Sequence, residues 1–185
     1  MNRVFLGFTL AIIFTTGTRA ADPCVSGTPV GQRPGPYSFL VATGPQRGQQ
    51  TCYICEQHEG NKPAVVVFAR STSDQLGKLL GRLESAGADA KDSGYKAWCT
   101  QLTPKADLDA LAKWAQKQGL KTLPVGALED ADGPPSYKLH KDADVTVLLF
   151  VKQKVVANFA FRAGDLSDKQ IDEVLKAVPQ LFEKK

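Results

Sequence analysis

The sequence predicts a single α/β domain in which helices cover both faces of a mixed β-sheet. Two long apolar runs, 64–69 and 145–151, are typical of strands that are buried on both faces. Segments with leucines at helical spacing lie between the predicted strands, and a last amphipathic segment follows them. Helices between buried strands require crossover connections, so the class is α/β rather than a meander of antiparallel strands.

The first half of the domain contains a short strand, a buried strand and a helix. Residues 37–42 are predicted as a short edge strand, and 64–69 form a strand of the sheet centre. Four leucines then follow at the spacing of one face of a helix: Leu76, Leu79, Leu80 and Leu83. Because Ser73 is a suitable N-cap residue, the helix is expected over 73–86.

The second half adds a helix between two strands and then a hairpin with a final helix. Residues 95–102 are predicted as a strand, Thr103-Pro104 open a helix over 104–118, and 122–128 are a short strand. The run 145–151 and its return over 155–161 form a hairpin. Ser167 and Gln170 have the spacing of a capping box before the last helix. Its apolar stripe consists of Ile171, Val174, Leu175, Val178 and Leu181.

Residues 1–20 have the three regions of a secretory signal peptide. Arg3 supplies the positive charge, Val4 to Phe14 are apolar, and Thr18 and Ala20 are the small residues that precede cleavage. We expect cleavage after Ala20 and a secreted or periplasmic protein without stable membrane insertion, the alternative being an uncleaved anchor. The Pro- and Gly-rich residues 21–36 are predicted to be a flexible lead-in to the domain of 37–185.

The charge of the exported part gives no reason to expect a polyanionic partner. Residues 1–20 hold two arginines and no acid, so the remainder has 21 basic and 19 acidic residues. The lysines and the acidic residues alternate along the chain without a basic block. We therefore expect no nucleic-acid partner.

Four cysteines are the most informative residues for chemistry. An exported chain meets an oxidising compartment, so disulfides are permitted, but four cysteines allow three pairings and the sequence does not choose among them. Cys99 lies in an alternating strand, so we expect a buried free thiol, with a bond to Cys24 as the alternative. The full set is Cys24, Cys52, Cys55 and Cys99.

Cys52 and Cys55 form a Cys-x-x-Cys that lies before the strand 64–69 and not after it. As a dithiol, the pair is a candidate redox couple, in which one thiolate attacks a partner disulfide and the other resolves the bond. The same two residues could instead form a structural disulfide that staples the segment before the central strand. If the pair is a redox couple, its expected partner is a protein thiol or disulfide.

His58 extends the motif to Cys-x-x-Cys-x-x-His. Cys52, Cys55 and His58, with Cys24 as a fourth ligand, are therefore weak candidates for Zn²⁺ or Cu(I). The chain has no second ligand pair at zinc-site spacing, so a solvated His58 is the favoured interpretation and no cofactor is predicted.

The order of strands and helices over residues 37–182 resembles the thioredoxin-like superfamily. The stretch Ala115 to Ala160 is most similar to the redoxin type, which includes thiol peroxidases and thiol-disulfide proteins. This type carries an extra strand and a loop of the kind seen in Glu129 to Gly133, followed by Tyr137. The resemblance implies a thioredoxin-like fold and thiol-disulfide chemistry.

The sequence departs from this family at its usual active site. Ser73 and Leu76 stand where the family would carry its two cysteines, and Val145 stands where many members have a cis-proline. Because the surviving thiols precede the central strand, we expect them toward the end of the sheet opposite the usual site. The hypothesis is thiol-disulfide exchange through Cys52 and Cys55; the alternative is a non-catalytic binding or scaffold module with a structural disulfide.

Overall fold

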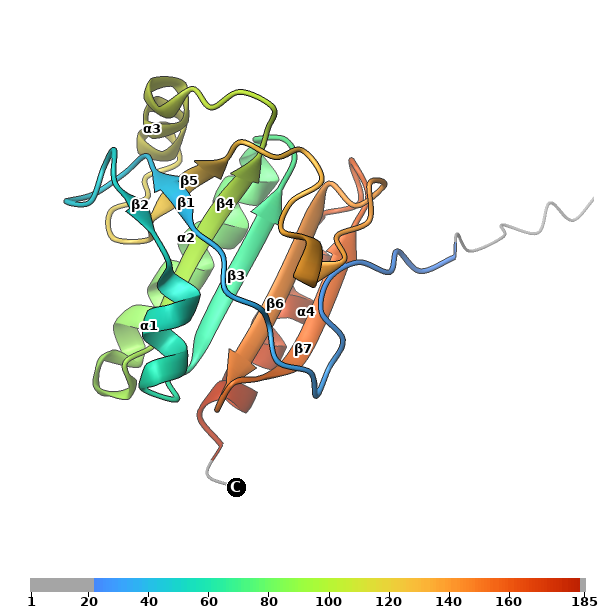
Figure 1. Cartoon of the computed structure of the whole chain (residues 1–185). Helices are drawn as coiled ribbons and strands as arrows, with labels where there is room; N and C mark the ends of the chain where they lie inside the picture. Colours follow the sequence, from blue (N-terminus) through green and yellow to red (C-terminus); the bar gives the residue numbers. More distant parts are fainter. Residues whose placement is uncertain (1–21, 184–185) are drawn as a thin grey trace, which may run out of the picture.

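The computed structural model describes residues 22–183, which contain a seven-stranded mixed sheet with helices on both faces (Figure 1). The predicted signal peptide lies outside these residues. The strands are β1 (Phe39–Val41), β2 (Gln50–Thr51), β3 (Ala64–Ala69), β4 (Lys96–Leu102), β5 (Val125–Leu128), β6 (Val145–Val151) and β7 (Lys154–Phe161). The α-helices are α1 (Tyr53–Glu59), α2 (Asp74–Asp89), α3 (Leu108–Lys117) and α4 (Asp168–Ala177). Short 3₁₀ turns are η1 (Lys91–Ser93), η2 (Pro135–Tyr137) and η3 (Val178–Leu181).

The strand order is β2-β1-β5-β4-β3-β6-β7, with a parallel centre and antiparallel edges. β3, β4 and β5 are parallel neighbours, whereas β6 is antiparallel to β3 and β1 is antiparallel to β5. The crossovers through α2 and α3 step in the same direction across the sheet. Since such crossovers are right-handed, both helices must cover the same face, and Leu79 of α2 and Leu111 of α3 accordingly pack in one cluster.

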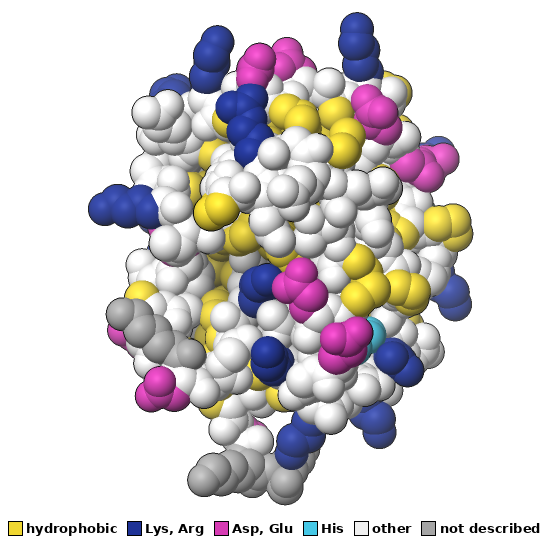
Figure 2. All heavy atoms as spheres, turned by 60° about the vertical axis from the view of Figure 1, so that its left-hand side comes forward, with side chains coloured by type: hydrophobic (Ala, Val, Ile, Leu, Met, Phe, Trp, Pro, Cys, Tyr) yellow, Lys and Arg dark blue, Asp and Glu magenta, His cyan; other side chains and the backbone are white. Residues whose placement is uncertain are grey.

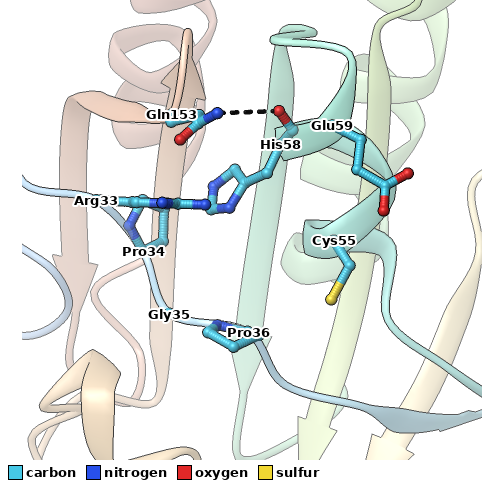
Figure 3. A pocket seen from close by; sticks show the side chains of 8 residues that line it. All are labelled: Arg33, Pro34, Gly35, Pro36, Cys55, His58, Glu59 and Gln153. Carbon is cyan, nitrogen blue, oxygen red and sulfur yellow. Dashed lines mark hydrogen bonds between the residues drawn. The ribbon is translucent and has the colours of Figure 1, made fainter.

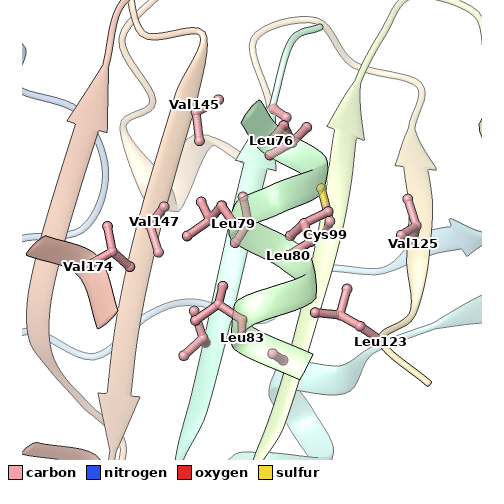
Figure 4. Close-up of a cluster of buried hydrophobic side chains, with 14 of the residues drawn as sticks. Leu76, Leu79, Leu80, Leu83, Cys99, Leu123, Val125, Val145, Val147 and Val174 are labelled. Carbon is pink, nitrogen blue, oxygen red and sulfur yellow. The ribbon is translucent and has the colours of Figure 1, made fainter. Parts of the chain in front are cut away.

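Alternate residues of the central strands supply two different cores. Val65 and Val67 of β3 point to the face covered by α2, α3 and α4, which we call the aliphatic face. Leucines of α2 pack there against valines of β5 and β6 (Figure 4). Val66 and Phe68 point to the opposite face, which α1 covers and which we call the aromatic face. Its large rings belong to Tyr37, Phe39, Tyr53, Phe68, Trp98, Tyr137 and Phe150.

The aromatic face also contains polar atoms, and they are hydrogen-bonded to one another. The indole Nε1 of Trp98 donates to the Tyr37 hydroxyl at 2.7 Å, and that hydroxyl lies 2.8 Å from Oγ1 of Thr100. The hydroxyl of Tyr137 donates to the carbonyl oxygen of Gly35 at 2.7 Å. Such pairing removes the cost of burying these polar groups.

The segment that we expected to be a flexible lead-in lies against the hairpin of β6 and β7 (Figure 1). Ser26 is buried and its hydroxyl lies 2.8 Å from that of Thr146. The N–H of Gly31 donates to the carbonyl of Val155 at 2.8 Å, and the N–H of Val155 donates to Gln32 at 2.9 Å. These bonds place the segment beside β7.

Most predicted elements are found close to their predicted bounds, with three corrections. The strand within 37–42 is not an edge strand, because β2 pairs with its free side. The helix expected from Pro104 begins at Leu108, since Asp107 accepts the N–H of Ala110 at 2.9 Å and so caps it. The third correction is that two elements, β2 and α1, were not predicted by the sequence analysis.

Both predicted helix caps lie at the starts of their helices. Ser73 is the N-cap of α2 and accepts the N–H of Leu76 at 3.1 Å. Ser167 is the N-cap of α4, but its hydroxyl contacts the side chain of Gln170 instead of a backbone N–H. Within residues 22–183, no helix combines the length and the apolar character needed to cross a membrane.

Candidate functional site

Cys52 and Cys55 are joined by a disulfide at the start of α1, with their Cα atoms 5.4 Å apart. Cys52 is the N-cap residue, and its carbonyl accepts the N–H of Cys55 at 3.1 Å. A spacing of three residues in this first turn brings the two side chains onto one side of the chain. The disulfide therefore follows from the local helical geometry of the Cys-x-x-Cys.

Tyr53 and Ile54 hold α1 on the aromatic face, because both side chains are buried. The ring of Tyr53 lies edge-on to Phe39 and Trp98, at centroid distances of 5.5 and 5.7 Å. Lys96 closes the outer side: its Nζ lies 4.0 Å from the centroid of the Tyr53 ring. The disulfide thus belongs to a helix that is anchored to the sheet.

α1 and the usual thioredoxin-like site lie on opposite faces of the sheet. Ser73 follows the carboxyl end of β3 and begins α2, on the aliphatic face. Cys52 and Cys55 pack at the aromatic face, and the carboxyl end of α1 reaches the turn before β7, where Gln153 donates to the carbonyl of His58 at 3.2 Å. The first residue of β3, Ala64, pairs with Phe150, which lies just before the same turn. The carboxyl end of α1 and the amino end of β3 are therefore at one end of the sheet, and Ser73 follows the other end of β3.

A cavity of about 630 Å³ lies between α1 and the lead-in segment (Figure 3). Cys55, which is partly exposed, lines it, and Figure 3 shows its sulfur on the side of Pro36. The segment 33–36 forms the opposite wall, and Tyr137 holds this wall through its bond to Gly35. The complete lining consists of Arg33, Pro34, Gly35, Pro36, Cys55, His58, Glu59 and Gln153.

His58 is buried at this cavity and is not the solvated residue that we expected. Its side chain packs edge-on to Phe150, with ring centroids 5.6 Å apart, and only 7% of the residue is exposed. Within residues 22–183, its Nε2 atom has no hydrogen-bond partner. Burial and the neighbouring Arg33 guanidinium lower the pKa of His58, so the ring is neutral near pH 7.

The weak metal hypothesis receives no support from the described part of the chain. Among residues 22–183, no group of three His, Cys, Asp or Glu side chains is placed to hold a metal ion. The sulfurs of Cys52 and Cys55 are bonded to each other. Cysteine ligates zinc as a thiolate, so the disulfide removes two of the three candidate ligands.

Cys24 and Cys99 are free thiols in this structure. Cys99 lies in β4 among the apolar side chains of the aliphatic face, where burial raises its thiol pKa to about 12. It is therefore an inert core residue, as we expected. Cys24 is half-buried in the lead-in segment.

The place of the usual family cysteines is occupied by structural residues. Ser73 caps α2 through its hydroxyl, and Leu76 is buried in the aliphatic core. Val145 stands at the position of the family's proline, and within residues 22–183 all peptide bonds are trans. Ser73 and Leu76 therefore have structural roles at the start of α2.

Charges of both signs are scattered over the side of the molecule shown in Figure 2, which was the left-hand side of Figure 1. Several are paired, as in the contact of Arg47 with Asp109 and the 2.7 Å contact of Lys96 with Glu56. No continuous basic surface gathers on this side, in keeping with the balanced composition.

Comparison with solved structures shows a common fold at low sequence identity. A candidate protein disulfide isomerase from Bacteroides thetaiotaomicron superimposes with a TM-score of 0.64, at 16% identity, over 86% of this chain and 94% of that one. A candidate thiol:disulfide interchange protein DsbE from Chlorobium tepidum gives 0.57 at 16% identity, over 81% of this chain and 98% of that one. A cysteine-to-serine mutant of peroxiredoxin Q from Xanthomonas campestris superimposes with a TM-score of 0.52 at 14% identity, over 80% of this chain and 92% of that one.

No known family matches the sequence, and no curated protein matches it either. The structural likeness nevertheless confirms the predicted fold class: the chain has a thioredoxin-like α/β fold, and its structural neighbours include redoxins such as peroxiredoxin Q. Within that class, it is a protein with a Cys52–Cys55 disulfide at the start of α1 and no cysteine at the start of α2.

Proposed function

We propose that this chain is an exported thioredoxin-like protein that carries out thiol-disulfide exchange through Cys52 and Cys55. The observation that carries the proposal is the accessible Cys-x-x-Cys disulfide, whose Cys55 side chain lines an open cavity. The fold supports it as well, since structural neighbours include a thiol-disulfide oxidoreductase domain from Bacteroides vulgatus. The expected partners are protein thiols and disulfides.

In the reduced protein, the Cys55 thiolate attacks one sulfur of a partner disulfide and releases the other partner sulfur as a thiolate. The product is a mixed disulfide between Cys55 and the partner. The Cys52 thiolate then attacks the Cys55 sulfur, which releases the second partner thiolate and restores the Cys52–Cys55 bond. Two electrons have passed from the pair to the partner, and an external thiol must reduce the pair again.

A second candidate function is a binding or scaffold module in which the disulfide is structural. The observation that favours it is the substitution of the usual site, where Ser73 caps a helix and Leu76 fills the core. The reduction potential of the pair separates the two functions. We expect a value near or above about −200 mV for a working couple, whereas a structural staple would lie below about −300 mV.

Turnover in cysteine variants tests the proposal directly. With dithiothreitol as the reductant, the wild-type protein should accelerate the reduction of insulin, and Cys52→Ser and Cys55→Ser should each abolish this activity. Cys52→Ser should also trap a mixed disulfide at Cys55, because the resolving thiol is missing. Ser73→Ala is the matched control, since it changes the usual family position and should leave turnover unchanged. Turnover that survives both cysteine variants would contradict the proposal, as would an inactive wild type.

Export is tested separately, by the mass of the mature protein. The order of charged, apolar and small residues in 1–20 supports cleavage after Ala20. Expression with the native leader should therefore yield an exported chain whose N-terminal residue is Ala21. Recovery of the full-length chain from the cytosol would refute this part of the proposal.

A further inference from the structure

We propose that the cavity beside Cys55 binds a small thiol that carries a carboxylate, and that Arg33 selects this class of reductant for the pair. The inference rests on the proposed function and deepens it, because it names the thiol that regenerates the dithiol. It is carried by the exposed cation of Arg33 and the buried His58, which line the cavity together with the partly exposed Cys55.

On one side of the cavity, Arg33 can bind a carboxylate beside the buried His58. Arg33 is exposed at the cavity, and within residues 22–183 its guanidinium forms no ion pair with a carboxylate, while Nε2 of the buried His58 lacks a hydrogen-bond partner. Figure 3 shows the two side chains directed toward each other across the space between the lead-in and α1. An arginine fork fits a carboxylate. Nε2 of His58 is itself buried, so Arg33 is the group that contacts the anion and His58 lies beside it.

The acidic residue of the cavity does not satisfy this cation. Glu59 contributes to the lining, but Figure 3 shows its carboxylate directed away from Arg33 and His58. Apart from Cys55, the remaining lining residues are two prolines, a glycine and Gln153, and all of them are uncharged. The Arg33 side therefore favours an anion, in agreement with the lowered pKa of His58, which Arg33 helps to keep neutral.

The spacing on α1 places such an anion close to the reactive sulfur. Cys55 and His58 are three residues apart on one helix, so their side chains are neighbours on its surface, with about 5–6 Å between Cβ atoms. A thiol whose sulfur and carboxylate are separated by two carbons can span this distance. 3-Mercaptopropionate has this length and is the simplest probe.

The reaction is an exchange that balances without any other reactant. The sulfur of the anionic thiolate bonds to Cys55 Sγ, the Cys52–Cys55 bond breaks, and its electron pair leaves on Cys52 as a thiolate. A second molecule of the same thiol then attacks the sulfur of the first. This step releases Cys55 as a thiolate and forms the symmetric disulfide of the small thiol.

The test compares three small thiols that differ in charge. The Cys52–Cys55 disulfide is reduced with 3-mercaptopropionate, 2-mercaptoethanol or cysteamine, and alkylation followed by peptide mass gives the rate. Each rate is divided by the rate of the same thiol with a neutral model disulfide, because nucleophilicity varies with thiol pKa. In wild type, we expect a normalised preference of about threefold or more for the anionic thiol over the neutral one.

Two arginine variants then test whether Arg33 causes the preference for the anionic thiol. Arg33→Gln should remove it, whereas Arg47→Gln is the control, because Arg47 lies in the loop before α1 and pairs with Asp109. A preference that is absent from wild type, or that survives Arg33→Gln, overturns this inference and leaves the proposed function intact. A disulfide that none of the three thiols reduces overturns the proposed function, and this inference falls with it.

Discussion

The two faces of the sheet are covered in different ways. On the aliphatic face, α2, α3 and α4 close a core of leucine, valine, isoleucine and alanine around residues such as Leu79 and Val147. On the aromatic face, the cover is one seven-residue helix, the turn η2 and the lead-in segment. This thinner cover holds large rings with hydrogen-bonded tips.

The difference indicates where chemistry can be placed in this fold. Regular helices close the core of the aliphatic face, and the cavity of about 590 Å³ on that side, lined by residues such as Glu84, Tyr95 and Lys121, has no cysteine in its lining. Irregular segments cover a face less completely, and the cavity beside Cys55 lies at such a junction of α1 with residues 33–36. The thiol pair occupies the face that regular secondary structure leaves least covered.

The largest expected effect comes from removing a core side chain on each face. Leu148 and Leu79 are both fully buried, Leu148 on the aromatic face and Leu79 on the aliphatic face. Leu148→Ala and Leu79→Ala should each lower the free energy of unfolding by about 2–5 kcal/mol, from lost packing and a residual cavity. Urea unfolding measures both. An effect of less than about 1 kcal/mol for Leu148→Ala would mean that the aromatic face is peripheral to stability.

Reduction of the Cys52–Cys55 disulfide should have a smaller effect. The bond closes a loop between residues three apart in sequence, and a loop this short gives about 2 kcal/mol in the chain-entropy model. Urea unfolding with and without dithiothreitol measures this contribution. The Cys52→Ser/Cys55→Ser double variant is the control, because its stability should not respond to the reductant. A loss well above about 3 kcal/mol would identify the disulfide as a main support of the aromatic face.

Tyr137→Phe tests how the lead-in segment is held to the aromatic face. The substitution removes the hydroxyl that donates to the carbonyl of Gly35 at 2.7 Å. We expect a loss of about 1 kcal/mol in the free energy of unfolding and faster amide exchange at Gly31. Tyr95→Phe is the matched control, because its hydroxyl bond, to Leu83 at 3.3 Å, lies on the other side of the sheet. Unchanged exchange at Gly31 would mean that the hydrogen bond does not hold the segment.

The smallest expected effect is a pH dependence on the aliphatic side, at Glu84 of α2. Burial alone would raise the pKa of Glu84, but the N–H groups of Thr122, Leu123 and Lys121, with the hydroxyl of Thr122, hold it below its ordinary value of 4.5. Since the pKa is lower in the folded than in the unfolded protein, the stabilisation is present above about pH 4.5. This stabilisation is lost as the pH falls through the pKa that Glu84 has in the folded protein.

Glu84→Gln measures this contribution. The difference in unfolding free energy between wild type and Glu84→Gln should shrink as the pH is lowered from 7 to 3. A difference that stays constant over that range would show that the carboxylate charge contributes nothing.

Much of the aliphatic side could be predicted from the sequence, because its signals are local. The uninterrupted apolar run of β3 and the leucines of α2 define their elements within a few residues, and Ser73 caps α2 as expected. Even there, the start of α3 was misplaced, since Thr103 and Pro104 form a turn and Asp107 supplies the cap. Two adjacent cap signals compete in such a segment, and tertiary contacts decide between them.

The aromatic side depends on contacts between distant parts of the sequence, so less of it could be predicted. α1 was missed because it is short and because two of its four buried residues, Gln57 and His58, are polar, so that no apolar stripe marks it in the sequence. The burial of His58 could not be predicted, since it depends on Phe150 and on the segment around Arg33. The Cys-x-x-Cys was recognised from sequence, but the cavity beside it depends on residues about twenty positions earlier.

The contacts of the lead-in segment also fix the order in which the molecule can assemble. Ser26 bonds to Thr146, and Gly31 and Gln32 bond to Val155, so the N-terminal residues are completed by a hairpin more than a hundred positions later. Closing such long loops is entropically costly and slow. A chain that is synthesised from its N-terminus can therefore form α1 and its disulfide early. Residues 33–36, which form the wall opposite Cys55, are held in place only after β7 has formed. A nascent or C-terminally shortened chain would have the disulfide without its cavity, exposed to any thiol it meets.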